Sequence, residues 1–268
     1  MNGLPVTAQE VITHLTEPAG ALESRIDGII AGTPEAEVRG IGVAFIASYE
    51  VVLEAVRLGV NLLVTHEGAF YSHQEERGLA PEDPVHAAKR KVIESEDMII
   101  YRFHDHPHSY RPDIITAGLL GALGWENHEH KDLGTASIVR LPQSLTLSEI
   151  AEHIKQKLNL PYLRAVGDSR TVCGQIGIAV GYRGGGQHAI PLFEQERLDL
   201  MIIGEGPEWE TPEYVRDAAA QGRSKALLML GHAASEEPGM KLISERLAGR
   251  FPGLPVHFIP TGTMIEIL

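Results

Sequence analysis

Short apolar runs alternate along this chain with longer segments in which apolar residues recur every three or four positions. Runs of the first kind are typical of buried strands, and segments of the second kind are typical of amphipathic helices. Strands that alternate with helices of roughly 10–15 residues indicate βαβ units, in which helices cover a largely parallel sheet. The pattern therefore predicts an α/β fold.

Capping and turn residues mark the expected ends of these segments. Ser48, Asp83 and Thr146 are typical helix N-caps, and Glu149 completes a capping box with Thr146. Gly59 stands where the helix that begins after Ser48 is expected to end. We expect helices at residues 8–17, 49–58, 84–94, 113–124, 147–158, 211–221 and near 240–247. We expect strands at residues 39–47, 61–65, 97–103, 135–141, 175–180, 198–203, 225–230, 256–259 and 263–267.

The number of these units indicates two lobes. A chain of 268 residues exceeds the usual size of one domain. We expect two α/β lobes with mixed, largely parallel sheets that are flanked by helices. Residues 1–125 together with 226–268 form the first predicted lobe, which carries most candidate site residues, and residues 126–225 form the second. The polar stretch at residues 72–82 is expected to be a loop that serves as a rim or lid.

Polar side chains follow the apolar runs of four expected strands. In an open α/β sheet, ligands bind beyond the carboxyl ends of the strands, so these side chains are expected to gather at one edge. Imidazoles and carboxylates without a thiolate suit Zn²⁺, Mn²⁺, Fe²⁺, Co²⁺ or Ni²⁺. A metal site is therefore predicted from His66 and Glu67, His104 to His108, Glu205, and His232 with Glu236.

Each of these signals has a plainer alternative. A single histidine is more often a hydrogen-bonded core residue than a metal ligand, and His66-Glu67 misses the zinc-protease pattern H-E-x-x-H because Phe70 stands at its last position. Pro107 would break a strand through His104–His108, so a loop is expected there. The Gly184-Gly185-Gly186 run could cradle a phosphate at a helix N-terminus, or it could be only a tight turn between strand and helix.

Composition and charge narrow the class of protein. With 36 acidic residues and a net charge of −13, the chain lacks the clustered cations that nucleic acid requires. Cys173 is the only cysteine, which excludes an internal disulfide and a cysteine-based zinc site. No apolar run is long enough to span a membrane, and the N-terminus does not have the pattern of a signal peptide. We expect a cytoplasmic protein with a small-molecule substrate and no membrane or nucleic-acid partner.

Five motifs together resemble a known family over nearly the whole chain. They are LLVTHEGAF, IYRFHDHPH, the GGGQ turn, IIGE and LGHAASE, the last being the most specific. In these the chain resembles the YbgI-type dinuclear metal-centre proteins, which are also known as GTP cyclohydrolase I type-two homologues. The resemblance implies two divalent metal ions, of Zn, Fe, Mn, Co or Ni, and a homo-hexameric ring.

The resemblance also assigns site residues. It implies that His66 and Glu67 take the positions of the family's paired histidines, and that His108 takes the position of its aspartate. His232 and Glu236 match the final histidine and the bridging glutamate. Two positions depart from the family pattern, Glu67 and His108, and we interpret them as an exchange of one histidine and one carboxylate around the same metal ion.

Three functions are compatible with the sequence. The first is a metal-dependent hydrolase that acts on a nucleotide-like or phosphorylated small molecule. In this hypothesis Glu205 is a base or an orienting group, and His104 moves protons. The second is a ring-forming, metal-binding protein with a regulatory or scaffolding role and no turnover. The third is a nucleotide-binding domain that uses the GGGQ turn without a metal.

Overall fold

The computed structural model describes residues 5–73 and 82–268. The predicted loop at residues 72–82 therefore lies largely outside the described residues. Two compact units make up the chain: residues 1–114 with 240–268, and residues 115–239. The units confirm the predicted α/β fold, because each contains one mixed sheet that helices flank.

The first unit is built on a five-stranded sheet with the order β1-β4-β3-β2-β11. Four of its strands run parallel, and β1 pairs antiparallel with β4 at one edge. The three central strands are buried along their whole length, as short apolar runs predict. The strands are β1 (Gly28–Ala31), β2 (Ile41–Ala44), β3 (Leu62–Thr65), β4 (Ile99–Arg102) and β11 (Val256–Phe258).

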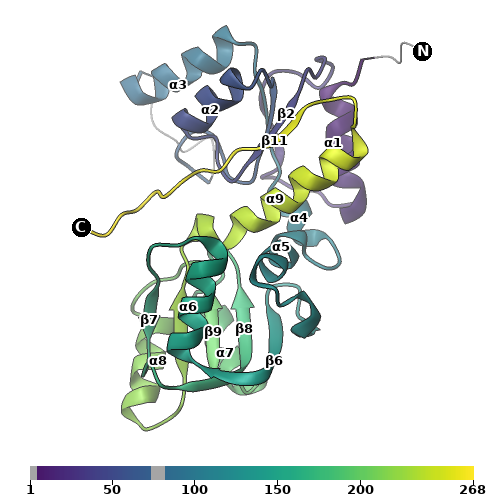
Figure 1. Cartoon of the computed structure of the whole chain (residues 1–268). Helices are drawn as coiled ribbons and strands as arrows, with labels where there is room; N and C mark the ends of the chain where they lie inside the picture. The colour runs from purple at the N-terminus through teal and green to yellow at the C-terminus, as the bar shows by residue number, and fades with distance from the viewer. Residues whose placement is uncertain (1–4, 74–81) are drawn as a thin grey trace. The chain divides into compact units, whose positions relative to one another are not determined.

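Helices cover both faces of this sheet (Figure 1). On one face, α2 and α3 bury Val52, Ala55 and Ile93 against Leu63 and Ile100 of the strands. On the other face lie α1 and the C-terminal part of α9. The helices are α1 (Ala8–Thr16), α2 (Tyr49–Arg57), α3 (Pro84–Ser95), the short α4 (Asp105–Ser109) and α9 (His232–Arg250), which begins in the second unit.

The predicted helix caps are present in the structure. The Ser48 hydroxyl accepts a hydrogen bond from the backbone N–H of Val51, and the Asp83 carboxylate accepts from two N–H groups of α3. Thr146 and Glu149 form the expected capping box of α6 (Leu147–Leu158). Each cap satisfies backbone donors that the first turn of a helix leaves without partners, so capping residues reveal helix starts in the sequence.

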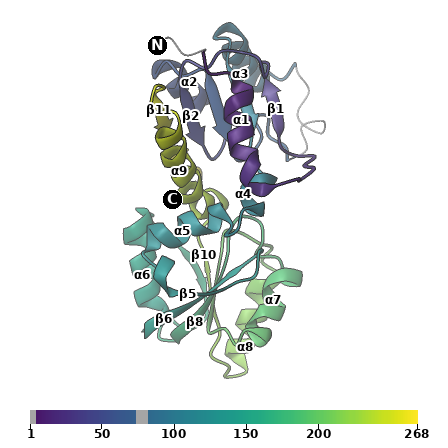
Figure 2. The same ribbon diagram turned by 90° about the vertical axis from the view of Figure 1, so that its right-hand side faces the viewer.

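The second unit is built on a six-stranded sheet with the order β5-β6-β8-β9-β10-β7. Its central strands β8, β9 and β10 are parallel, and the strands outside them are antiparallel. In Figure 2, α7 and α8 lie on one side of this sheet and α5 and α6 on the other. The strands are β5 (Glu129–Asp132), β6 (Ser137–Thr146), β7 (Arg164–Val166), β8 (Val172–Ala179), β9 (Leu200–Ile203) and β10 (Ala226–Met229); the helices not yet given are α5 (Ile114–Leu123), α7 (Gly186–Gln195) and α8 (Thr211–Ala220).

Two local predictions are wrong. His104–His108 belongs largely to the helix α4, where a loop was expected; Pro107 is tolerated because a first helical turn needs no N–H there. The Asp27 carboxylate accepts hydrogen bonds from the backbone N–H groups at the start of α4 and stabilises that turn. The expected strand at residues 263–267 is absent, and its apolar side chains are exposed.

The boundaries of the compact units differ from those of the predicted lobes at residues 125 and 226. The strand β10 belongs to the second unit because it pairs with β9 and β7 of the same sheet. The helix α9 crosses the second boundary as one continuous helix. Within residues 5–73 and 82–268, no helix combines the length and the apolar character needed to cross a membrane.

The structure makes a prediction for the cysteine. Cys173 is buried on β8, and burial, with the negative charge of Asp199, raises the pKa of its thiol to about 12. Only the thiolate is nucleophilic, so at pH 8 about one molecule in 10⁴ is reactive, against roughly a quarter for a free thiol. We expect an aromatic disulfide reagent to label the native protein very slowly and the urea-unfolded protein completely. Rapid labelling of the native protein would contradict this burial.

Candidate metal centre

His66 is held at the end of the buried strand β3. The backbone N–H groups of His66 and Glu67 both donate to the carbonyl of Phe45, which follows β2, at 3.0 and 2.8 Å. The imidazole is fully buried, and its Nδ1 lies 3.1 Å from the carbonyl oxygen of Phe103. Because a carbonyl only accepts, Nδ1 carries the proton, and Nε2 has the lone pair that a metal ion requires.

His108 is oriented in the same way from α4. Its Nδ1 lies 2.9 Å from Oδ2 of Asp113, a buried carboxylate that follows α4. The carboxylate accepts a hydrogen bond from Nδ1–H, so Nε2 again carries the lone pair. The ring centroids of His66 and His108 are 5.0 Å apart, with the ring planes nearly perpendicular. Two imidazoles of the first unit thus share one tautomer and lie side by side.

In the second unit, α9 begins with a histidine–carboxylate pair. His232 and Glu236 are four residues apart on the helix, and His232 Nε2 lies 3.1 Å from Oε2 of Glu236. His232 Nδ1 lies 2.9 Å from Oε1 of Glu205, which follows β9. Burial lowers the pKa of His232, but its hydrogen bonds and charge interactions with Glu236 and Glu205 outweigh burial and raise it to about 9. Glu205 is therefore within hydrogen-bond distance of the imidazole of His232.

A glycine allows the end of β8 to approach this pair. Gly181 has a φ of 63°, and a Cβ added to it would collide with Oε1 of Glu236. Its N–H donates to the hydroxyl of Ser235 at 2.9 Å, and that hydroxyl donates to the carbonyl of His232 at 2.7 Å. Both the backbone conformation and the space thus require glycine at this position.

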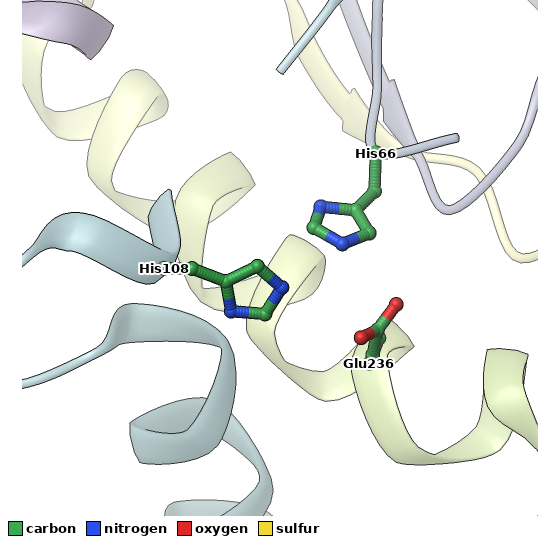
Figure 3. Close-up of side chains that lie close together, drawn as sticks. All are labelled: His66, His108 and Glu236. Atoms are coloured by element: carbon green, nitrogen blue, oxygen red, sulfur yellow. The ribbon is translucent and has the colours of Figure 1, made fainter. Parts of the chain in front are cut away.

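Three groups among the described residues have donor atoms within 4.8 Å of one another and could hold a metal ion. One of them contains His66 and His108 of the first unit, whose side chains Figure 3 shows. The others are Glu67 with His73 and His104, and Asp27 with His104 and Asp105. No group contains both Glu67 and His108, the two residues that the sequence analysis assigned to one ion.

Glu67 is engaged with a buried arginine. Its Oε2 lies 2.6 Å from Nη2 of Arg102, whose side chain is 1% exposed, and its Oε1 lies 3.6 Å from Nε2 of His104. Burial raises the pKa of Glu67, but the hydrogen bond with His104 and the nearby positive charges lower it to about 2. Glu67 is therefore the counter-ion of Arg102.

His104 links Glu67 to the start of α4. Its Nδ1 lies 2.8 Å from Oδ1 of Asp105, and its ring stacks on that of His66 at 4.6 Å. Burial lowers the pKa of His104, but its hydrogen bonds with Glu67 and Asp105 outweigh burial and raise it. In the third group, Asp27 already accepts from the α4 backbone and from His106, and Asp105 accepts from Ser24. These contacts indicate a structural role for the third group.

The glycine run after β8 forms a tight turn. The N–H of Gly186, at the start of α7, donates to the carboxylate of Glu210 at 2.5 Å. Gly184 donates its N–H to the carbonyl of Glu205, and a Cβ on Gly184 would collide with Ile203. A side chain of the protein thus occupies the position that a phosphate would need, which favours the turn over the nucleotide-binding interpretation.

The structure also reveals residues that sequence analysis missed. Arg102, Asp113 and Asp27 hold Glu67, His108 and the start of α4, respectively. Of the three, only Arg102 carried a signal, because it is a charged residue in an otherwise apolar run that was correctly predicted to be a strand.

The fold and these residues define an α/β protein with histidine and carboxylate groups that could hold metal ions. The sequence profile of the Duf34/NIF3 family (NGG1p interacting factor 3) matches residues 7–264. The chain belongs to the Duf34/NIF3 family, which confirms the resemblance noted in the sequence.

Relatives and solved structures agree with this assignment. A GTP cyclohydrolase 1 type 2 homolog from Clostridium acetobutylicum is 24% identical over 230 residues, covering 83% of this chain and 81% of the relative. The homolog from Escherichia coli K12 is 26% identical over 210 residues, 75% of this chain and 76% of its own. Staphylococcus aureus protein SA1388 has the same fold, with a TM-score of 0.75 at 17% identity, over 98% of this chain and 100% of that one. A Bacillus cereus protein related to NIF3 has a TM-score of 0.76 at 15% identity, over 99% of both chains.

The contact between Gly181 and Glu236 gives a matched pair of variants. Gly181→Ala should displace Glu236 and weaken the binding of Mn²⁺ or Zn²⁺ by at least about tenfold. Gly222→Ala is the control, because Gly222 has a similar φ of 76° with no atom within 4 Å of the added Cβ. Both changes strain the backbone by roughly 1–2 kcal/mol, so only the steric contact differs. Equal affinities in calorimetric titrations of the two variants would show that Glu236 does not bind the metal.

Proposed function

We propose that this protein binds a divalent metal ion through His66 and His108 of the first unit and uses it to hydrolyse a phosphorylated or nucleotide-like small molecule. Imidazole and carboxylate donors without a thiolate suit Zn²⁺, Mn²⁺, Fe²⁺, Co²⁺ or Ni²⁺. Of the two ions that the family resemblance implies, the ion at His66 and His108 is the one that this proposal requires.

One observation carries the proposal: the Nδ1 atoms of both His66 and His108 face acceptors. The acceptors are the carbonyl of Phe103 for His66 and the carboxylate of Asp113 for His108. Histidines that bind metals in proteins have this arrangement, because the acceptor fixes the tautomer and makes the other nitrogen a better donor. The donor set therefore fits a metal ion.

When bound, the ion would lower the pKa of a water molecule and stabilise negative charge on a substrate's oxygen atoms. The protein's own residues supply the remaining functions. His232, with Nε2 facing Glu236, can accept or return a proton, and the Glu205 carboxylate holds its ring in position. His104 is the second candidate for moving protons, since it lies within reach of both Glu67 and Asp105.

The names of the relatives suggest the first substrates to test. GTP cyclohydrolase 1 type 2 homologs are matched over most of their length, so ring opening of GTP belongs in a panel beside phosphate esters. The proposal includes a homo-hexameric ring in the cytoplasm, as the family resemblance implies. A metal-binding ring without turnover is the alternative, and it is a separate outcome of the test.

The test begins with metal-free protein reconstituted with Mn²⁺, Zn²⁺ or Co²⁺. We expect at least one tightly bound ion per chain by elemental analysis, and metal-dependent hydrolysis of a member of the panel that a chelator abolishes. His108→Ala should lose both the ion and the activity. Asp113→Asn should retain the ion but weaken its binding by about 10–100-fold, because a neutral amide replaces the charged acceptor of the hydrogen bond from His108 Nδ1.

His106 provides the matched control. Its Nδ1 also faces a carboxylate, that of Asp27, at 2.6 Å, but His106 belongs to none of the three donor groups. His106→Gln should therefore leave the metal affinity within about twofold. A folded wild-type protein that binds no ion would refute the proposal. Bound metal without turnover across the whole panel would favour the non-catalytic ring.

A further inference from the structure

We infer that this chain holds a single divalent ion, because the guanidinium of Arg102 provides the positive charge at the group formed by Glu67, His73 and His104. The inference rests on the proposed metal site and departs from the two-ion centre that the family resemblance implies. The contacts of Arg102 that carry it all lie within the first unit.

Arg102 is bound within the second donor group. Its Nη2 lies 2.6 Å from Oε2 of Glu67 and 3.0 Å from Nδ1 of His73, and its Nη1 donates to the carbonyl of His73 at 2.7 Å. The strand register explains its place, because Arg102 of β4 pairs with Thr65 of β3, the residue before His66. Arg102 thus lies at the carboxyl end of β4, beside the candidate metal ligand His66.

The charge of Arg102 is permanent and poorly screened. A guanidinium stays protonated at any pH at which proteins fold, and its side chain here is 1% exposed. Buried charges interact more strongly than charges in water, so a divalent ion among the same donors would be repelled. A buried arginine also requires a counter-ion. If Glu67 bound a metal ion instead, Arg102 would lose the carboxylate with which it forms an ion pair.

The charges at the other group are different. The two ring nitrogens of His232 contact the carboxylates of Glu205 and Glu236. These three side chains together therefore carry a negative charge even when His232 is protonated. Glu67 and Arg102, in contrast, sum to zero. A cation is therefore attracted to the side chains around Glu236, and not to Glu67 with His73 and His104. In this centre the water that attacks the substrate would be activated by one ion.

The number of bound ions tests the inference directly. Metal-free protein is incubated with excess Mn²⁺ or Zn²⁺, desalted, and measured by elemental analysis and calorimetry. We expect one ion per chain. Glu67→Gln preserves the shape of the side chain and should still bind one ion, with Kd changed by less than about threefold, because Glu67 is not a ligand.

Arg102→Met removes the positive charge of the guanidinium and should allow a second ion to bind. Added metal should then raise the Tm of this variant more than it raises the Tm of the wild type. The double variant Arg102→Met with Glu67→Gln should return to one ion. Arg170→Met is the control, since Arg170 forms an exposed ion pair with Asp168 at 2.9 Å and its loss should leave one ion.

The outcomes separate this inference from the proposed function. Two ions in the wild type, or loss of the ion in Glu67→Gln, would overturn the single-ion centre while leaving metal binding intact. No ion in the wild type would overturn the metal site itself and the inference with it. If Arg102→Met fails to fold, Glu67→Gln alone still decides, because the two accounts predict opposite results for that variant.

Discussion

The hydrogen bond at Nδ1 is the interaction on which the candidate site depends. A neutral imidazole has one donor and one acceptor nitrogen, so an acceptor placed at Nδ1 decides that Nε2 carries the lone pair. The carbonyl of Phe103 does this for His66, and the carboxylate of Asp113 does it for His108. The placement of these acceptors therefore determines whether the histidines can bind a metal ion at all.

The acceptors are in place because paired, buried strands hold the backbone around them. Phe103 follows β4 directly, and the buried strands β3 and β4 pair in parallel register, which sets its carbonyl beside His66. The α4 helix, capped by Asp27, holds His108 in a similar way. In the second unit the α9 helix spaces His232 and Glu236 by one turn, and Gly181 leaves room for the carboxylate. Strands and helices thus fix the positions of these side chains, and the side chains provide the atoms that could bind a metal ion.

Local rules predicted most of the fold and part of the site. Capping residues such as Ser48 and Thr146 act within a few residues, so the sequence reveals them, and the same holds for the one-turn spacing of His232 and Glu236. Arg102 and Asp27 form hydrogen bonds with Glu67 and His104, residues that are far from them in the sequence. No local sequence pattern indicates such contacts. The same limit explains why the ion pair between Glu67 and Arg102 was not predicted: the position of Glu67 after a strand was visible in the sequence, but its arginine partner was not.

The most direct measurement is anomalous scattering at the metal edge from crystals grown with Zn²⁺ and no chelator. The account predicts one strong peak about 2.0–2.2 Å from Nε2 of His66 and Nε2 of His108. A peak at Glu67 instead, or no peak at these two side chains in a well-ordered crystal, would contradict it.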